Sequence, residues 1–215
     1  LEFTFINPQK EVVALSLFDA DQDQDLDLYL GYGHNGENNP EILQDELMLN
    51  DGKGNFKVDS SALPQITASG SCVRAADFDA DGDLDLFVGG RMVAGSYPLP
   101  ASSYILQNNG GVFTDVTEKV CAELRLPGMV TDAIWSDFDR DGKPDLVLVG
   151  EFMPTTFFKN DGVNLTKLST TGIQQYIGWW NSISSGDFDN DGELDLYVPS
   201  GCYSAPTEVK TKIDL

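Results

Sequence analysis

The sequence has few of the residue types that many binding and catalytic classes need. Its 215 residues include one histidine and 13 lysines and arginines, against 35 aspartates and glutamates. The net charge of −22 argues against nucleic acid or an anionic membrane as partner, because both require basic side chains that neutralise phosphate. No apolar run approaches the roughly 18 residues of a transmembrane helix, so no membrane span is expected.

Cysteine is also scarce. Cys72, Cys121 and Cys202 cannot all pair within one chain, and they lack the spacing of metal ligands. Convincing helical periodicity is absent as well. Hydrophobic residues nevertheless make up 41% of the chain, which is close to the norm for a globular protein. The sequence therefore predicts a folded, all-β protein whose acidity needs a separate explanation.

The acidic residues are concentrated in four similar segments, each with aspartate at relative positions 1, 3, 5 and 9. These segments begin at Asp19, Asp77, Asp137 and Asp187. A second motif, an Asn/Gly turn, recurs in the same phase around Asn50, Asn108 and Asn160. Two motifs that keep one phase indicate an internal repeat of about 50–60 residues. The repeats cover about 11–66, 70–126, 129–176 and, in part, 180–215, so that one repeat region spans 1–215.

Each repeat reads as short strands separated by turns. Segments rich in β-branched and apolar residues precede the acidic runs at 12–18, 72–76, 131–135 and 181–185, and apolar runs follow them. A second hairpin then surrounds each Asn/Gly turn. Four antiparallel strands per repeat is the arrangement of a β-propeller blade.

The aspartate spacing is that of a calcium loop. Ca²⁺ takes six to eight oxygen ligands, and alternate aspartates in a tight turn direct several carboxylates inward. The backbone carbonyl of position 7 is well placed as a further ligand, and the aspartate at position 9 closes the site. The predicted metal residues are Asp19, Asp21, Asp23, Asp25 and Asp27; Asp77, Asp79, Asp81, Asp83 and Asp85; Asp137, Asp139, Asp141, Lys143 and Asp145; Asp187, Asp189, Asp191, Glu193 and Asp195. About four Ca²⁺ ions are expected.

Two details of these loops can be tested. An EF-hand would need glutamate at position 12 and flanking helices, but position 12 is apolar in all four copies: Leu30, Val88, Leu148 and Val198. The first copy has Gln24 where the others have the glycine of the sharp turn. Strain or lower affinity is expected there.

The loops and the "NDGKGNF"-type turns resemble the FG-GAP/VCBS repeats of integrin α-subunit-like β-propellers, and in particular bacterial relatives of the cartilage acidic protein group. The literal Phe-Gly and Gly-Ala-Pro signature is absent. The resemblance implies calcium loops between the first two strands of each blade, a segment of a larger propeller of about seven blades, and secretion or cell-surface display. It also implies missing blades or a partner chain at the open edges.

The loops between the second and third strands differ among repeats, at residues 31–45, 89–103 and the short "GEFMPT". Variable loops on a repeated scaffold usually carry function. In integrin-like propellers this face, opposite the calcium loops, binds ligands. The candidate ligand residues are His34, Arg91, Tyr97, Trp179 and Trp180. For the two tryptophans, packing between blades is the favoured alternative.

The sequence shows no recognisable catalytic set. His34 lies in a polar loop, and the clustered aspartates are committed to metal. The leading hypothesis is a non-catalytic, calcium-binding extracellular propeller that binds a protein or a glycan. The alternatives are part of a carbohydrate-active enzyme such as a polysaccharide lyase, for which Arg91, Glu37 and Glu41 are the only hints, and a structural assembly module.

Overall fold

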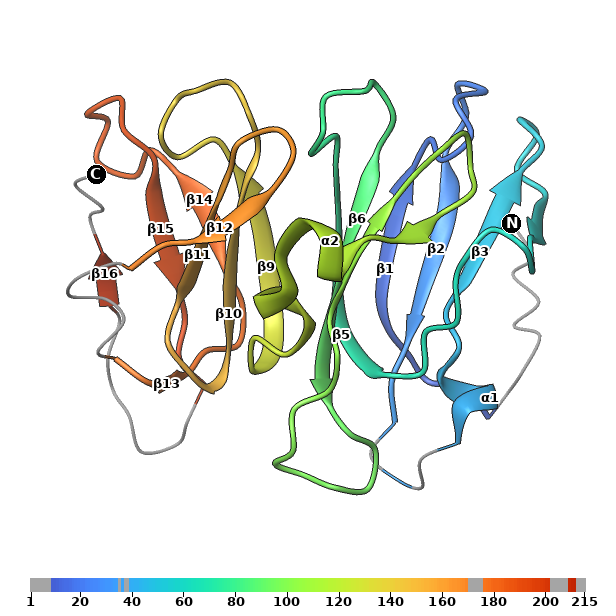
Figure 1. Cartoon of the computed structure of the whole chain (residues 1–215), viewed down its shortest axis with the longest axis horizontal. Coiled ribbons are helices and arrows are strands. Elements are labelled where there is room, and N and C mark those ends of the chain that lie inside the picture. Colours follow the sequence, from blue (N-terminus) through green and yellow to red (C-terminus); the bar gives the residue numbers. More distant parts are fainter. Residues whose placement is uncertain (1–8, 35, 37–38, 170–175, 202–208, 212–215) are drawn as a thin grey trace.

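The computed structural model describes residues 9–34, 36, 39–169, 176–201 and 209–211, and its strands form four antiparallel sheets. Figure 1 shows the sheets side by side in chain order, the first at the right and the fourth at the left. Each sheet corresponds to one sequence repeat and is called a blade below. The fold is therefore all-β, with the four-stranded sheets expected of propeller blades.

Blades 1 and 2 are four-stranded meanders in which each strand pairs with the next. Blade 1 contains β1 (Val12–Phe18), β2 (Asp27–Tyr32), β3 (Glu46–Asn50) and β4 (Phe56–Val58). Blade 2 contains β5 (Ser69–Ala76), β6 (Asp85–Met92), β7 (Tyr104–Gln107) and β8 (Thr114–Asp115). The predicted first strand at 12–18 coincides with β1, and the acidic segments connect the first two strands of each blade as expected.

Blades 3 and 4 follow the same plan with local additions. Blade 3 contains β9 (Met129–Ser136), β10 (Asp145–Met153), β11 (Thr156–Asn160) and β12 (Leu165–Lys167), and β10 also pairs with β13 (Gly178–Trp179). Blade 4 contains β14 (Ser184–Gly186), β15 (Asp195–Val198) and β16 (Val209–Thr211). The strand predicted at 181–185 begins later, because the Ile183 N–H bonds to the side chain of Asp132 at 3.0 Å.

Hydrophobic cores lie between successive blades. Consecutive residues of β10 alternate between two of them: Leu146 and Leu148 pack toward blade 2, whereas Val147 and Val149 pack toward blade 4. Side chains alternate across a strand, so a strand buried on both faces needs an unbroken apolar run. This explains the sequence "LVLV" at the centre of blade 3.

Polar contacts also join the blades. Arg74 of β5 pairs with Asp132 of β9, and its Nε donates to the Ala133 carbonyl at 2.8 Å. The Trp135 indole N–H returns a bond to the Arg74 carbonyl at 3.1 Å. Trp135 is half-buried and stacks on Phe78. These bonds fix the register of blade 3 against blade 2.

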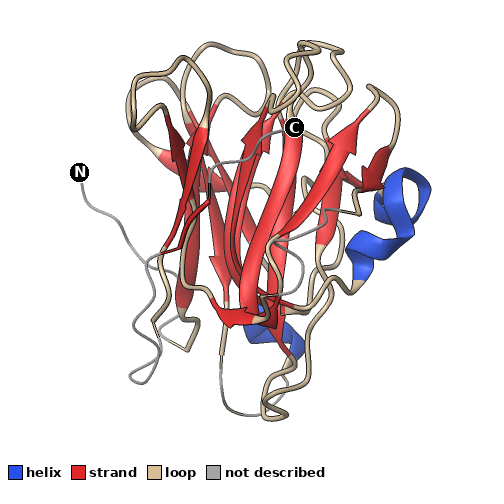
Figure 2. Cartoon of the chain, turned by 90° about the vertical axis from the view of Figure 1, so that its left-hand side faces the viewer, coloured by secondary structure: helices blue, strands red, loops and turns tan. Residues whose placement is uncertain are grey.

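The described helices are short and peripheral (Figure 2). They are α1 (Pro40–Leu43), α2 (Thr117–Cys121) and the 3₁₀ helix η1 (Ala122–Arg125). None of the three was predicted, because a helix of one turn gives no periodicity to detect. The last two bury Val120 and Leu124 in the core between blades 2 and 3. In the part of the chain that the structure describes, no helix has the length and apolarity of a membrane span. Cys72 and Cys121 are free thiols, and Cys202 lies outside the described residues.

Candidate metal centres and the opposite face

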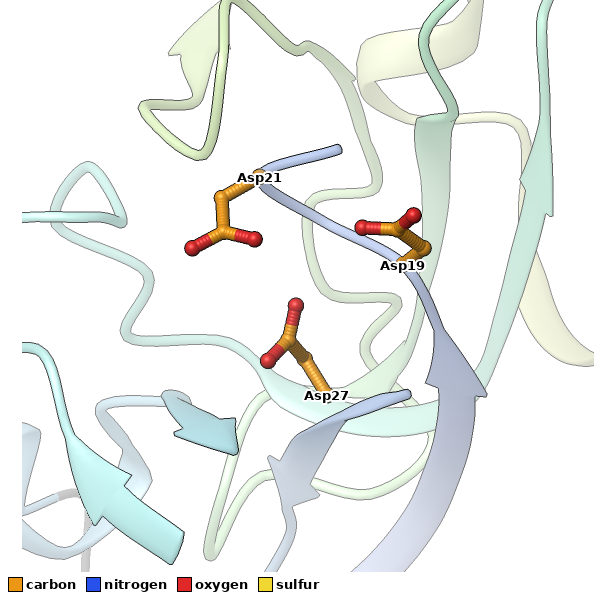
Figure 3. Close-up of side chains that lie close together, drawn as sticks. All are labelled: Asp19, Asp21 and Asp27. Atoms are coloured by element: carbon orange, nitrogen blue, oxygen red, sulfur yellow. The ribbon is translucent and has the colours of Figure 1, made fainter. Parts of the chain in front are cut away.

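The four acidic loops lie at one edge of the blades, at the top of Figure 1. In each loop the aspartates at positions 1, 3 and 9 offer carboxylate oxygens that all lie within 4.8 Å of one another. In the first loop these residues are Asp19, Asp21 and Asp27, whose carboxylates face a common space in Figure 3. The equivalent groups are Asp77, Asp79, Asp85; Asp137, Asp139, Asp145; and Asp187, Asp189, Asp195.

Backbone hydrogen bonds to the position-1 aspartate shape each loop. In the second loop the two oxygens of Asp77 accept from the N–H groups of Asp81 (3.1 Å) and Gly82 (3.2 Å). The turn requires a left-handed backbone at position 6, where φ is +99° at Gly82, +87° at Gly142 and +84° at Gly192. In the first loop Gln24 occupies this position with φ +75°. The strain expected from the missing glycine is present.

The aspartate at position 9 has a second role that sequence reasoning missed. Asp85 is fully buried, and its two oxygens accept from the N–H groups of Phe78 (3.2 Å) and Asn108 (2.8 Å). Asp27 and Asp145 make the equivalent bonds. This aspartate therefore ties the acidic loop to the second hairpin of its own blade.

The asparagines of the second motif connect neighbouring blades. The amide nitrogen of Asn108 donates to the carbonyl of Ala20 in the acidic loop of blade 1, at 2.8 Å. Asn160 repeats the bond to Phe78 in the loop of blade 2, at 2.7 Å. Both side chains are buried. Asn108 and Asn160 keep the phase of the acidic loops because each bonds to the loop of the preceding blade, whereas Asn50 in blade 1 donates to the Leu26 carbonyl of its own loop.

The electrostatics of the loops favour a bound cation. Burial raises the pKa of Asp85 to about 7, despite the backbone N–H groups of Asn108 and Phe78, which lower it. Burial, followed by the charge of neighbouring aspartates, also raises the pKa of Asp21. The buried Oδ1 atoms of Asp19, Asp21 and Asp79 have no hydrogen-bond partner among the described residues. Unsatisfied buried carboxylate oxygens are costly unless a donor or an ion meets them.

The donor set fits a hard divalent cation. All of the clustered ligands are carboxylate oxygens, the type that Ca²⁺ and Mg²⁺ prefer. Two oxygens on one Ca²⁺ lie at most about 5 Å apart, since each bond is about 2.3–2.6 Å, and the groups meet this limit. Position 5 lies outside these groups; in the second loop the Asp81 Oδ1 accepts from the Asp83 N–H at 3.2 Å. The ligand roles of positions 5 and 7 stay predictions.

In the third loop, two lysines lie against the aspartate carboxylates. Lys159 of β11 pairs with Asp139 and lies 3.5 Å from Asp141, and Lys143 lies 3.1 Å from Asp141. The hydrogen bond to Asp139 is the main cause of the raised pKa of Lys159. The ammonium groups compete with a cation for the same carboxylates. The four loops are therefore not electrostatically equivalent.

The candidate ligand residues on the opposite edge separate into two groups. Arg91, Tyr97 and Trp179 line one pocket of about 480 Å³, together with Met92 and Gly95. Trp180 and His34 do not line it. The Trp180 ring is 7% exposed, and its indole N–H donates to the Met153 carbonyl at 3.0 Å, so it packs between blades and does not face a ligand. The His34 Nδ1 lies 3.6 Å from a carboxylate oxygen of Glu11.

Two residues beside the pocket were missed from the sequence. Glu151 of β10 is 2% exposed, and its carboxylate binds both Arg91 and Tyr97. Phe152 is 52% exposed, and its ring lies between those of Tyr97 (6.4 Å) and Trp179 (5.1 Å). The only sequence signal was the short "GEFMPT" segment. Glu41 belongs to the first turn of α1 and does not line the pocket, and Glu37 lies outside the described residues.

Comparison with known proteins gives one sequence family and one related fold. The sequence model of a family described as FG-GAP-like repeat matches residues 19–88 and 137–198. A search of the curated proteins finds no match. Among solved structures, the chain resembles a lectin of Agrocybe aegerita, whose structure is described as the basis of specific recognition of non-reducing terminal N-acetylglucosamine. The TM-score is 0.54 at 18% identity, over 86% of this chain and 46% of that one, so the chain spans less than half of that structure. At this identity the similarity supports the fold alone.

Proposed function

Because the chain belongs to the FG-GAP-like repeat family, we propose that it is a calcium-stabilised, non-catalytic binding module that acts outside the cell on a protein or glycan. The proposal rests on one observation: each of the four acidic loops holds a group of three aspartate carboxylates close together. The unpartnered buried oxygens of Asp19, Asp21 and Asp79 support it. We further propose that the blades belong to a larger propeller of about seven blades.

In this proposal calcium stabilises the fold and takes no part in chemistry. The loops bring four aspartates close together, and their mutual repulsion opposes the turn until a cation neutralises it. An ion that binds only the folded state adds about 2.7 kcal/mol at one hundred times its Kd. In a domain of this size such a gain raises the melting temperature by about 5–10 °C.

Thermal melts in chelator, Ca²⁺ and Mg²⁺ test this role. We expect a large fall in melting temperature with chelator, full recovery with Ca²⁺ and weak recovery with Mg²⁺, which keeps its waters and demands octahedral geometry. Calorimetric titration should give about four ions. An unchanged melt in chelator would refute the calcium role.

Single-site variants test the assignment loop by loop. Asp79→Asn keeps the side-chain shape and removes one charge from the second loop, so the stoichiometry should fall by one ion. Asp191→Asn should do the same in the fourth loop through position 5. If Asp191→Asn leaves the stoichiometry unchanged, position 5 is not a ligand in that loop.

The same loops support the proposed extracellular setting. Extracellular calcium modules bind with Kd values of about 10⁻⁴–10⁻³ M and are filled by the calcium outside cells. A strained first loop and a third loop with competing lysines fit such modest affinities. A Kd below about 10⁻⁷ M at all four loops would contradict this setting, because such sites are typical of intracellular buffers and sensors.

The binding function rests on the face opposite the calcium loops. The pocket there brings Arg91, Tyr97 and Trp179 together from two blades, on the variable loops where a repeated scaffold usually carries function. An array of glycans and extracellular proteins, probed in calcium, is the direct test. Release of unsaturated sugars from an acidic polysaccharide by the purified protein would contradict the non-catalytic part of the proposal.

A further inference from the structure

We propose that the pocket lined by Arg91, Tyr97 and Trp179 binds one uncharged pyranose ring. The inference rests on the binding function proposed above, and it gives that function a place and a ligand class. The pocket lies where blades 2 and 3 meet, because Arg91 belongs to β6, whereas Trp179 belongs to β13, which pairs with β10. Its volume of about 480 Å³ is in the range of sites for small ligands.

Aromatic rings form the apolar part of the pocket. Tyr97 is 49% exposed, and the ring of Phe152 packs edge-on against Trp179 with 5.1 Å between centroids. An aromatic face carries negative charge density and attracts the weakly positive C–H groups on the face of a pyranose ring. The rings are held by one another, so little side-chain freedom is lost when a ligand stacks on them.

A fixed ion pair supplies the polar part. The Arg91 Nε and Nη2 both bond to the Glu151 Oε1, at 2.8 and 2.5 Å, and the Tyr97 hydroxyl donates to Oε2 at 3.0 Å. The Glu151 side chain is 1% exposed, whereas that of Arg91 is 39% exposed. Glu151 is therefore a positioning residue. It orients Arg91 so that the remaining N–H groups of the guanidinium can bond to hydroxyl or carbonyl oxygens of a ligand.

Charge decides between a neutral and an acidic sugar. Glu151 neutralises Arg91, so the pocket offers directed donors without net positive charge. The chain as a whole carries a net charge of −22, which repels anions. A uronic acid would gain no ion pair and would be repelled, whereas a neutral pyranose would gain the stacking and the hydrogen bonds at no charge cost.

The backbone at Phe152 supplies an independent observation. This residue has φ +56°, in the left-handed region that non-glycine residues rarely adopt, and it interrupts the pairing of β10 with β13 between Glu151 and Met153. Strain of this kind persists at binding sites, where the surrounding structure enforces it. Here it displays a half-exposed ring between Tyr97 and Trp179.

Tryptophan fluorescence can detect the binding, because Trp179 lines the pocket. The probes are the methyl glycosides of glucose, galactose, mannose and their 2-acetamido forms, with methyl glucuronide and galacturonide as acidic counterparts, all in saturating Ca²⁺. We expect saturable binding of at least one neutral glycoside and weaker binding of both acidic ones. No saturation by any neutral glycoside up to about 100 mM, where even the weakest specific sites fill, would overturn the proposal.

Three variants test the site. Trp179→Leu removes the stacking ring and should weaken binding about tenfold or more, measured by calorimetric titration because this variant lacks the fluorescent reporter. Phe152→Gly relieves the left-handed strain, so the variant should melt no lower than the parent and still bind about threefold or more weakly. Glu151→Gln leaves Arg91 unneutralised, and the ratio of acidic to neutral affinity should rise about tenfold. A merely structural Glu151 would lower both affinities equally, which would overturn its positioning role.

Phe188→Ala is the matched control. Phe188 is 59% exposed in the fourth acidic loop, and the first loop carries Ala20 at the same position. The Phe188→Ala variant should bind the glycosides with the same affinity as the parent. If a neutral glycoside binds but Phe152→Gly and Trp179→Leu leave the affinity unchanged, the proposed site is wrong although the binding function stands. If the chelator melt is also unchanged, the calcium proposal fails separately.

Discussion

Gln24 gives the sharpest test of how these loops are built. Its φ of +75° places it in the left-handed region that glycine occupies in the other three loops. Its N–H still bonds to the Asp19 carboxylate at 3.0 Å, as the Gly82 N–H does to Asp77 at 3.2 Å, so the loop keeps its geometry at the cost of backbone strain. We expect Gln24→Gly to stabilise the protein.

The magnitude follows from two opposing effects. The left-handed conformation costs a non-glycine residue about 1–2 kcal/mol. Glycine offsets about 0.5–1 kcal/mol of this gain, because it loses more backbone freedom on folding. The net gain in the free energy of unfolding should be about 0.5–1 kcal/mol, or about 1–4 °C in melting temperature for a chain of this length.

The assay is urea unfolding of Gln24→Gly in chelator and in Ca²⁺, beside the reverse change Gly82→Gln. A Cβ added to Gly82 would meet nothing within 4 Å, so this control isolates the backbone cost. Gly82→Gln should destabilise by a similar amount. A destabilised Gln24→Gly, or a Gly82→Gln indistinguishable from the parent, would refute the assignment of strain to position 6.

Three further predictions follow from described contacts. Burial raises the pKa of Asp45 from 3.8 to about 7, so its contribution to stability is full below pH 4 and is lost as pH rises through 7. Asp45→Asn should remove roughly 2–3 kcal/mol of this dependence between pH 5 and pH 8, measured in chelator as the difference between parent and variant. Lys159→Gln should raise the affinity of the third loop for Ca²⁺, because it removes a competing ammonium. An unchanged Ca²⁺ titration would show that the lysine does not compete. Asn160→Ala removes the two bonds that its buried amide nitrogen donates, one of them to the preceding blade, and should cost about 3 kcal/mol of unfolding free energy. Asn50→Ala removes a single donated bond, to Leu26 of its own loop, and should cost about 1 kcal/mol; equal losses would contradict the inter-blade role.

The sequence predicts the strands and the acidic loops well because their signals are local. The run of β-branched and apolar residues in 12–18 and the aspartate spacing from Asp77 each lie within one short segment. Calcium binding, secretion and the blade number remain predictions. The pocket was foreseen only in part, because its contacts are not local. Arg91 and Glu151 are 60 residues apart in the sequence and meet through the packing of two blades.

Very short elements were also not predicted from the sequence. The two-residue strand β13 and the one-turn helix α2 are too short to leave a periodic pattern. Trp179 and Trp180, adjacent in the sequence, were both candidate ligand residues with packing between blades as the favoured alternative, and each of these interpretations holds for one of them. Strand geometry places successive side chains on opposite sides, so one lines the pocket and the other enters the core.

The bond from Asn160 to the carbonyl of Phe78 has a consequence for how such chains grow. The second repeat supplies both halves of this joint, Asn108 for the blade before it and the Phe78 carbonyl for the blade after it. A duplicated repeat therefore inherits both halves of the joint and can dock on either neighbour without a new mutation. Copying a gene segment would lengthen the row of blades in register, and loops on the far edge could then diverge without disturbing the joints.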